Sequence, residues 1–133
     1  MVGVLLVTHK DLAEAFLSAF NLIMGHQEGI QALSLDPVAS PETLLQQIHS
    51  AITQLNNGDG VLILTDMLGG TPSNLSLSFL EEGQVEVVTG VNLPMLLKLA
   101  NVRQGHSLAE IARALKESGQ SGITVAGEVL NQK

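Results

Sequence analysis

The sequence contains no cysteine, no tryptophan and no tyrosine, and only three phenylalanines among its 133 residues. Without cysteine the protein can have no disulfide framework, no thiol nucleophile and no thiolate metal site. Scarce aromatic side chains argue against a nucleic-acid surface built from stacking platforms. They also require an aliphatic core, which suits a sheet covered by helices better than a β-sandwich.

Basic residues are few as well, since 6 Lys and Arg stand against 13 Asp and Glu, for a formal charge of −7. Such an acidic chain should not bind nucleic acid or anionic membranes non-specifically, although it can attract a partner with a basic face. No stretch approaches the roughly 20 apolar residues of a membrane span. The short apolar N-terminus lacks the basic lead-in and cleavage site of a signal peptide. We therefore expect one cytoplasmic domain over residues 1–133.

Apolar runs alternate along the chain with segments of helical periodicity. We expect strands at residues 2–7, 30–35, 61–64 and 84–89, and a last short strand at 123–126. We expect helices at about residues 12–25, 41–55, 71–80, 94–100 and 107–119. Strands that alternate with helices predict parallel pairing and right-handed crossovers. The expected fold is therefore α/β, with a doubly wound, mostly parallel four-stranded sheet flanked by helices.

Residues 61–74, which read VLILTDMLGGTPSN, are the most informative stretch. They begin with an apolar strand that should be buried on both faces, and Asp66 follows where this strand should end. Gly69 and Gly70 then permit an unusual backbone path, and Thr71 is expected to cap a helix whose first residue is Pro72. A helix start offers unpaired N–H groups and partial positive charge, both suited to a phosphate.

His9 follows the first strand as Asp66 follows the third. In doubly wound sheets ligands bind at the carboxyl ends of strands, so these two side chains meet if the strands are neighbours. The carboxylate would then fix the imidazole tautomer and leave the other ring nitrogen as a nucleophile. Taken alone, His9 is equally well a polar loop residue, and Asp66 is more simply a turn residue or a cap.

The candidate phosphoryl-binding groups are the backbone around Gly70 and the hydroxyls of Thr71 and Ser73. Capping is the alternative role of both hydroxyls, and for Thr71 the two roles can coexist. Thr8 either orients the His9 loop or simply ends a strand.

The sequence argues against other kinds of site. It has no Walker-type lysine loop, no G-x-G-x-x-G and no G-x-S-x-G motif. The remaining histidines, His26, His49 and His106, are expected on the surface. Because no two histidines share a metal-binding spacing, we expect no metal.

Three segments together resemble a known family. Residues 3–9 read GVLLVTH, residues 65–74 read TDMLGGTPSN, and residues 89–95 read TGVNLPM. The chain resembles the mannose-family IIA component of the bacterial phosphoenolpyruvate-dependent sugar phosphotransferase system over nearly its whole length. Its D-x-x-G-G-T-P-x-N block is specific, and chance would not supply all three segments in order.

This resemblance implies a phosphohistidine carrier that needs no metal or cofactor. The phosphorylated histidine falls on His9, its carboxylate partner on Asp66 and the hydroxyl near the phosphate on Thr71. The phosphoryl group would arrive from the phosphocarrier HPr and leave to a histidine of a separate IIB component, so any membrane contact would be indirect. The resemblance also implies a homodimer, in which the strand Ile123–Ala126 crosses to the partner's sheet and pairs there in the antiparallel sense.

Other interpretations remain open from the sequence. One is the phosphocarrier subunit of dihydroxyacetone kinase, against which the D-x-x-G-G-T-P-x-N block favours the sugar system. Another is a regulatory module that is read out by its phosphorylation state. A flavodoxin-like cofactor binder is disfavoured, since no aromatic is available to sandwich a flavin. Ser73 stands where family members often carry an aromatic, which concerns the docking surface and not the chemistry.

Overall fold

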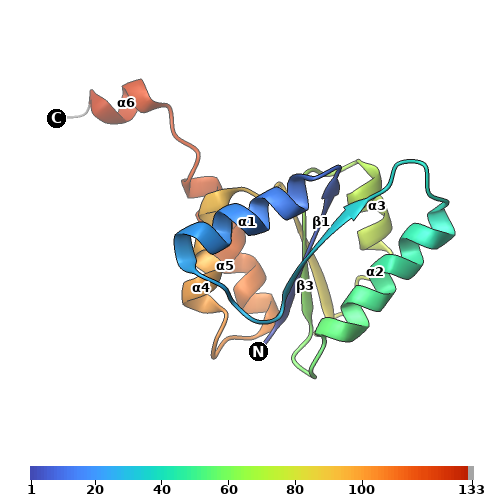
Figure 1. Ribbon diagram of the computed structural model, residues 1–133. Helices are drawn as coiled ribbons and strands as arrows, with labels where there is room; N and C mark the ends of the chain where they lie inside the picture. The colour runs from blue at the N-terminus through green and yellow to red at the C-terminus, as the bar shows by residue number, and fades with distance from the viewer. Residues whose placement is uncertain (132–133) are drawn as a thin grey trace.

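The computed structural model describes residues 1–131, which form a four-stranded parallel sheet with helices on both faces (Figure 1). The strands lie in the order β2-β1-β3-β4. Their bounds are β1 (Gly3–His9), β2 (Ile30–Leu35), β3 (Val61–Thr65) and β4 (Val85–Thr89). The predicted doubly wound fold is confirmed, and β2 lies at an edge of the sheet.

Six helices follow or connect these strands within residues 1–131. Their bounds are α1 (Leu12–Met24), α2 (Pro41–Leu55), α3 (Thr71–Leu77), α4 (Leu93–Val102), α5 (Leu108–Ser121) and α6 (Ala126–Leu130). Helices α1, α4 and α5 cover one face of the sheet, and α2 and α3 cover the other (Figure 1). Helix α3 is shorter than the sequence predicts, because residues 78–80 form a turn outside the helix.

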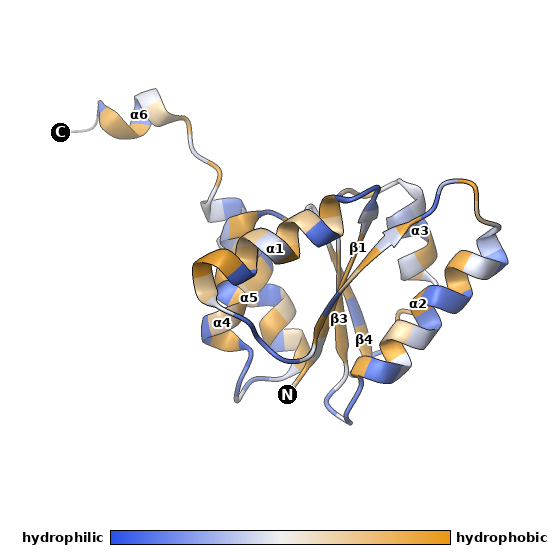
Figure 2. Ribbon diagram, viewed as in Figure 1, coloured by the Kyte–Doolittle hydropathy of each residue, from blue (hydrophilic) through white to orange (hydrophobic). Residues whose placement is uncertain are grey.

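The alternation of side chains along β1 explains why this strand is apolar at every position. Val4 and Leu6 pack into the core with α1, α4 and α5, whereas Leu5 and Val7 pack into the core with α2. Successive residues of a strand point to opposite faces, so a strand covered on both faces needs apolar residues throughout. Hydropathy follows the same layering, with apolar strands between amphipathic helices (Figure 2).

The register of β1 and β3 brings the two predicted site residues together. These strands are direct neighbours, and Val7 pairs with Thr65. His9 and Asp66 therefore lie at the same carboxyl edge of the sheet. The predicted adjacency of the first and third strands is confirmed.

Two predicted helix starts carry the expected caps. The Ser40 hydroxyl accepts a hydrogen bond from the Thr43 N–H at the start of α2. Ser107 and Glu110 form a reciprocal capping box at the start of α5. Such bonds satisfy N–H groups that have no partner within the helix.

The predicted last strand is wrong for the single chain. Residues Ile123–Val125 have no regular structure, and Ala126 begins the five-residue helix α6 instead. All residues from Ser121 to Asn131 are exposed, and the segment leads away from the body of the molecule (Figure 1). A strand needs a neighbour for its backbone N–H and C=O groups, and in the described part of the chain no strand pairs with this segment.

Among residues 1–131, no helix has both the length and the apolar character that crossing a bilayer requires.

Candidate active site

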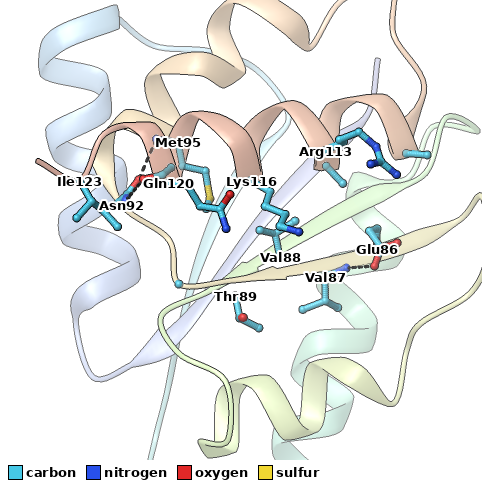
Figure 3. Close-up of a pocket in the computed structure, with 14 residues that line it drawn as sticks. Glu86, Val87, Val88, Thr89, Asn92, Met95, Arg113, Lys116, Gln120 and Ile123 are labelled. Carbon is cyan, nitrogen blue, oxygen red and sulfur yellow. Dashed lines mark hydrogen bonds between the residues drawn. The ribbon is translucent and has the colours of Figure 1, made fainter.

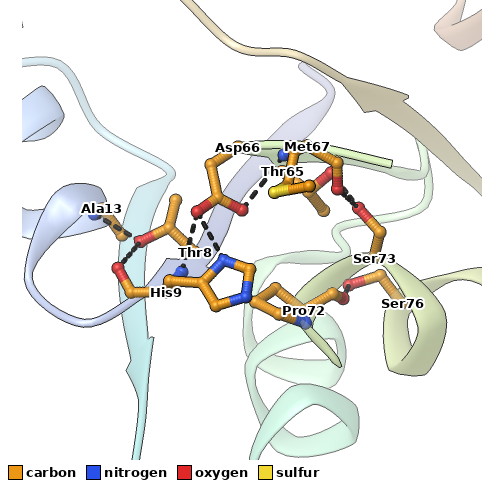
Figure 4. A network of polar contacts seen from close by, with 9 residues as sticks. All are labelled: Thr8, His9, Ala13, Thr65, Asp66, Met67, Pro72, Ser73 and Ser76. Atoms are coloured by element: carbon orange, nitrogen blue, oxygen red, sulfur yellow. Dashed lines mark hydrogen bonds and ion pairs between the residues drawn. The ribbon is translucent and has the colours of Figure 1, made fainter. Parts of the chain in front are cut away.

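His9 and Asp66 form a hydrogen-bonded pair at the carboxyl edge of the sheet (Figure 4). The Asp66 Oδ2 lies 2.8 Å from the His9 Nδ1 and also accepts the His9 backbone N–H at 3.0 Å. The imidazole side chain is 47% exposed, whereas the carboxylate is only 12% exposed. One carboxylate oxygen thus fixes both the backbone and the ring of a histidine that stays open to solvent.

This geometry selects one ring nitrogen for chemistry. A carboxylate can only accept hydrogen bonds, so a neutral imidazole in this pair carries its proton on Nδ1. Its Nε2 then holds a free lone pair and is the nucleophilic position. The carboxylate also stabilises positive charge on the ring when Nε2 forms a bond.

The environment of Asp66 favours its ionised form. Partial burial by itself raises the pKa of this carboxyl, but the hydrogen bonds and charge of His9 outweigh that effect and leave the pKa below its ordinary value. The Met67 N–H also donates to Oδ1, at 3.1 Å. Asp66 is therefore an anion at neutral pH.

Gly70 faces the reactive edge of the imidazole. A Cβ built on Gly70 would lie 2.5 Å from the His9 Cε1 and 2.9 Å from Nε2. Only a residue without a side chain allows the ring to lie this close to the backbone at the start of α3. Gly69 precedes it with φ of 95°, a left-handed conformation that favours glycine.

The start of α3 differs from the sequence prediction. Gly70 is the N-cap, without a side-chain capping bond, and Thr71 is already the first helical residue. The capping role predicted for Thr71 is therefore wrong. Its exposed position beside Gly70 leaves its hydroxyl uncommitted to the cap.

The loop that carries His9 is held by Thr8. The buried Thr8 hydroxyl accepts the Ala13 N–H at 2.7 Å and donates to the His9 carbonyl at 3.2 Å. Lys10 follows with φ of 46° and is the only non-glycine residue with positive φ in the described part of the chain. These two bonds support the predicted orienting role of Thr8, and the bond to Ala13 also fixes the first turn of α1.

The Ser73 hydroxyl is turned away from the imidazole. Ser73 is fully buried, and its Oγ bonds to the Thr65 hydroxyl and to the Met67 carbonyl (Figure 4). The sequence prediction that this hydroxyl binds a phosphoryl group is not retained, because both of its bonds lie inside the protein. Thr65 was not identified from the sequence as the partner of Ser73. A threonine at the end of an otherwise apolar strand was the available signal that its hydroxyl has a hydrogen-bonding role.

Comparison with known proteins shows the family to which the chain belongs. The family model described as "PTS system fructose IIA component" matches residues 3–116. The chain belongs to this family of sugar phosphotransferase IIA components. The family resemblance stated from the sequence is thereby confirmed.

Curated relatives of this IIA family member include the PTS system fructose-specific EIIA component of Bacillus subtilis, with 30% identity over 99% of this chain and 91% of the relative. The mannose-specific EIIAB component of Escherichia coli is 30% identical over 92% of this chain, which spans only 38% of that protein. Among solved structures, the phosphotransferase system component EIIA of Streptococcus agalactiae superposes with a TM-score of 0.87 at 25% identity, over 96% of this chain and 99% of that one.

The other three histidines of this IIA family member lie apart from the site. His26 is 3.5 Å from the Glu28 carboxylate, His49 stacks on Phe79 with ring centroids 6.2 Å apart, and His106 bonds to backbone carbonyls. All three are exposed, as predicted. Within residues 1–131, no group of three or more His, Cys, Asp or Glu side chains is arranged to hold a metal ion.

A separate groove runs along the free edge of β4. Its volume is about 590 Å³, and it lies between β4 and α5 (Figure 3). Val87 and Thr89 line it from the strand, and Arg113 and Lys116 line it from the helix. Within residues 1–131, β4 is an edge strand with one side that faces no other strand of the sheet, although Val85 there pairs with Glu81 and the Val87 N–H donates to the Glu86 carboxylate at 2.9 Å.

Proposed function

We propose that this IIA family member is a phosphohistidine carrier, whose His9 accepts a phosphoryl group from phosphorylated HPr and passes it to a separate IIB component. The observation that carries this proposal is the 2.8 Å contact between the His9 Nδ1 and the Asp66 Oδ2. That contact leaves Nε2 as the free nucleophile of the pair.

In the first step the lone pair of Nε2 attacks the phosphorus of the donor's phosphohistidine. The new N–P bond forms as the donor's N–P bond breaks, and the donor imidazole leaves with the bonding electrons. The His9 ring becomes cationic, and the Asp66 anion stabilises it through Nδ1–H. The second step reverses this chemistry toward a histidine of the IIB component.

The transferred phosphoryl group would lie against the start of α3. Gly70 contacts the Nε2 edge of the ring, and the exposed Thr71 follows it directly. The Thr71 hydroxyl and the backbone N–H groups beside it are therefore the proposed donors to phosphoryl oxygens. These groups act at the place where charge develops during the transfer.

The surface around His9 suits a protein donor and acceptor. Leu12 on α1 and Met67 and Leu68 after β3 are large apolar side chains, and each is between 45% and 66% exposed. Exposed apolar side chains gathered beside a reactive group are typical of protein-interaction sites. The proposed partners are cytoplasmic proteins, which places the reaction in the cytoplasm.

The proposed sugar system follows from the relatives. Those compared above are described as fructose-specific or mannose-specific components of the phosphotransferase system. Their descriptions favour the sugar system over the dihydroxyacetone kinase subunit.

A phosphorylation assay tests the proposal. The protein is incubated with phosphoenolpyruvate, the first enzyme of the system and HPr, and acid-labile phosphate is then measured. We expect one phosphoryl group per chain in the wild type and none in His9→Ala. His26→Ala, which removes an exposed histidine elsewhere, is the matched control and should label fully. Full labelling of His9→Ala would contradict the proposal.

We further propose that the chain is a homodimer, in which residues 122–131 dock along β4 of a second copy. Ile123, Val125 and Leu130 are 75%, 63% and 82% exposed in the single chain. Helix α6 has only five residues, too few to be stable without packing. The groove along β4 offers apolar side chains, Val87 and Val88 among them, to such a segment.

Truncation after Ser121 tests the dimer, because α5 ends there and its core contacts stay intact. We expect sedimentation to show a dimer for the full chain and a monomer for the truncated chain. A truncated chain with unchanged dimer mass would contradict this mode of association.

A further inference from the structure

Two buried hydroxyls lie behind the site and touch no part of the imidazole. Thr65 is the last residue of β3, and Ser73 belongs to the first turn of α3. Both are fully buried, and their oxygens are 2.6 Å apart (Figure 4). Neither hydroxyl takes part in the transfer step proposed for His9.

The direction of these hydrogen bonds can be assigned. A carbonyl oxygen only accepts, so the single O–H of Ser73 must be donated to the Met67 carbonyl. The Ser73 oxygen then accepts the O–H of Thr65. The order is therefore Thr65 to Ser73 to Met67, with each hydroxyl donating once.

This chain of bonds continues to the reactive ring. The Met67 N–H donates to Asp66 Oδ1 at 3.1 Å, and Asp66 Oδ2 accepts from the His9 Nδ1 at 2.8 Å. The Thr65 backbone is itself fixed, because its carbonyl accepts the Val91 N–H at 3.0 Å. A rigid point in the sheet is thus connected through four residues to the imidazole.

We propose that Thr65 and Ser73 are positioning residues, which hold the Asp66 loop so that the carboxylate keeps the His9 proton on Nδ1. This inference rests on the proposed carrier function and adds to it the groups that set the geometry of the pair. Residues 67–70 have no other regular structure to hold them, and Gly69 and Gly70 give this stretch wide backbone freedom. The Ser73 hydroxyl ties that stretch to α3.

The chain offers a matched control for a merely structural hydroxyl. Ser76 is also fully buried in α3, and its hydroxyl donates to the Pro72 carbonyl at 2.6 Å. That bond lies within the helix and does not connect to Asp66. Ser73→Ala and Ser76→Ala therefore each remove one buried serine hydroxyl, but only the former breaks the path to His9.

The test compares Ser73→Ala, Ser76→Ala, Thr65→Val and Thr65→Ser. Valine has the shape of threonine without its hydroxyl, whereas serine keeps the donor, so the Thr65 pair separates the hydrogen bond from packing. We expect the maximal transfer rate from phosphorylated HPr to fall about tenfold in Ser73→Ala, with little change in KM, because the pair is misplaced and not the docking surface. We expect a smaller fall in Thr65→Val, and rates near wild type in Thr65→Ser and Ser76→Ala.

A second readout does not depend on phosphotransfer. The ¹⁵N shifts of the His9 ring report which nitrogen carries the proton of the neutral form. We expect the Nδ1–H form to dominate in the wild type, Ser76→Ala and Thr65→Ser, and a mixture of both forms in Ser73→Ala and Thr65→Val. An effect on folding alone would lower stability without changing this ratio.

The outcomes separate the two proposals. Wild-type tautomer ratios and transfer rates in folded Ser73→Ala and Thr65→Val would overturn the positioning role, even if His9 is phosphorylated as proposed. Should Ser73→Ala fail to fold, the tautomer ratios of His9 in Thr65→Val and Thr65→Ser still test the positioning role. A shifted ratio in a protein that takes no phosphate from HPr would support the positioning role and reject the carrier function.

Discussion

The two ends of the parallel sheet are held together in opposite ways. At the carboxyl end, small hydroxyls and glycines hold two loops and leave the His9 ring 47% exposed. At the amino end, the buried guanidinium of Arg103 donates to the backbone carbonyls of Val2, Glu28 and Gly29. Within residues 1–131 no carboxylate pairs with this arginine, and burial lowers the pKa of its guanidinium.

The bonds at the amino end mainly stabilise the fold, whereas those at the carboxyl end mainly orient the His9 side chain. The Arg103 guanidinium donates to three carbonyls and so joins the residue before β1 to the loop before β2. Because Arg103 is buried, the amino end is held by a group that is shielded from solvent. The hydrogen bonds at the carboxyl end orient His9, whose side chain stays exposed to solvent. Changes at the site should therefore affect transfer more than stability, and changes at Arg103 should do the reverse.

The largest expected effect is that of Asp66→Asn on transfer. The asparagine keeps the size of the side chain but loses the charge that stabilises the ring cation, and its amide can select the wrong tautomer. We expect the transfer rate from phosphorylated HPr to fall about 10²-fold or more while the fold is kept. Asp36→Asn, at the end of β2, removes another strand-end carboxylate and should keep the wild-type rate. A wild-type rate in Asp66→Asn would contradict the orienting role.

Arg103→Met should have the opposite profile. Three backbone carbonyls lose the guanidinium as a donor, and within residues 1–131 only that of Gly29 keeps another one, the Val4 N–H. We therefore expect the free energy of unfolding to fall by about 3 kcal/mol, measured by urea denaturation. Phosphorylation of the folded protein should stay within about twofold of wild type, because Arg103 lies at the far end of the sheet. A large loss of transfer without loss of stability would contradict the assignment of a mainly stabilising role to the amino end of the sheet.

Gly70→Ala should impair transfer with little effect on stability. The φ of Gly70 is −90°, which alanine adopts freely, so the added methyl acts only by pushing against the His9 ring. We expect an approximately tenfold slower transfer, measured by single turnover from phosphorylated HPr.

Gly69→Ala is the reciprocal control for this prediction. Its Cβ would meet nothing within 4 Å, but its φ is 95°. We expect it to cost about 1 kcal/mol of stability through backbone strain. Equal transfer rates for Gly70→Ala and wild type would show that the ring does not lie against Gly70.

The smallest expected effect is the acid dependence of stability. The pKa of Asp66 lies below its ordinary value of 3.8, so its stabilising contribution is complete above that value. It is lost as the pH falls through the lower pKa of the folded state. Urea unfolding at about pH 5 and pH 3 should show the difference between wild type and Asp66→Asn shrinking at the lower pH. A difference that grows in acid would contradict the sign of this shift.

Several features of the fold were predictable because they depend on local chemistry. The apolar runs before His9 and Asp66 indicated strands buried on both faces, and the structure places both in the centre of the sheet. Caps at Ser40 and Ser107 were predictable because the capping bonds join residues three apart. The pairing of His9 with Asp66 followed from the rule that sites lie at strand ends in this class of fold.

Other features were not predictable because they depend on where distant groups lie. The sequence predicts Thr71 as the N-cap of α3, but the helix begins one residue earlier and Gly70 is the N-cap. The sequence also placed the Ser73 hydroxyl on a phosphate, although Thr65 and the Met67 carbonyl hold it inside the protein. Residues 123–126 read as a strand, yet a strand forms only beside a neighbour, and the single chain provides none.

The sequence by itself determined the four strands of the sheet, helices α1 to α5 in outline, the family and the candidate pair His9 and Asp66, because each follows from neighbours along the chain or from motifs of fixed spacing. Only the tertiary structure decided which nitrogen of His9 is free, why Gly70 must lack a side chain and which hydroxyls face inward. These properties depend on distances of about 3 Å between groups far apart in sequence, and packing of the whole chain sets such distances.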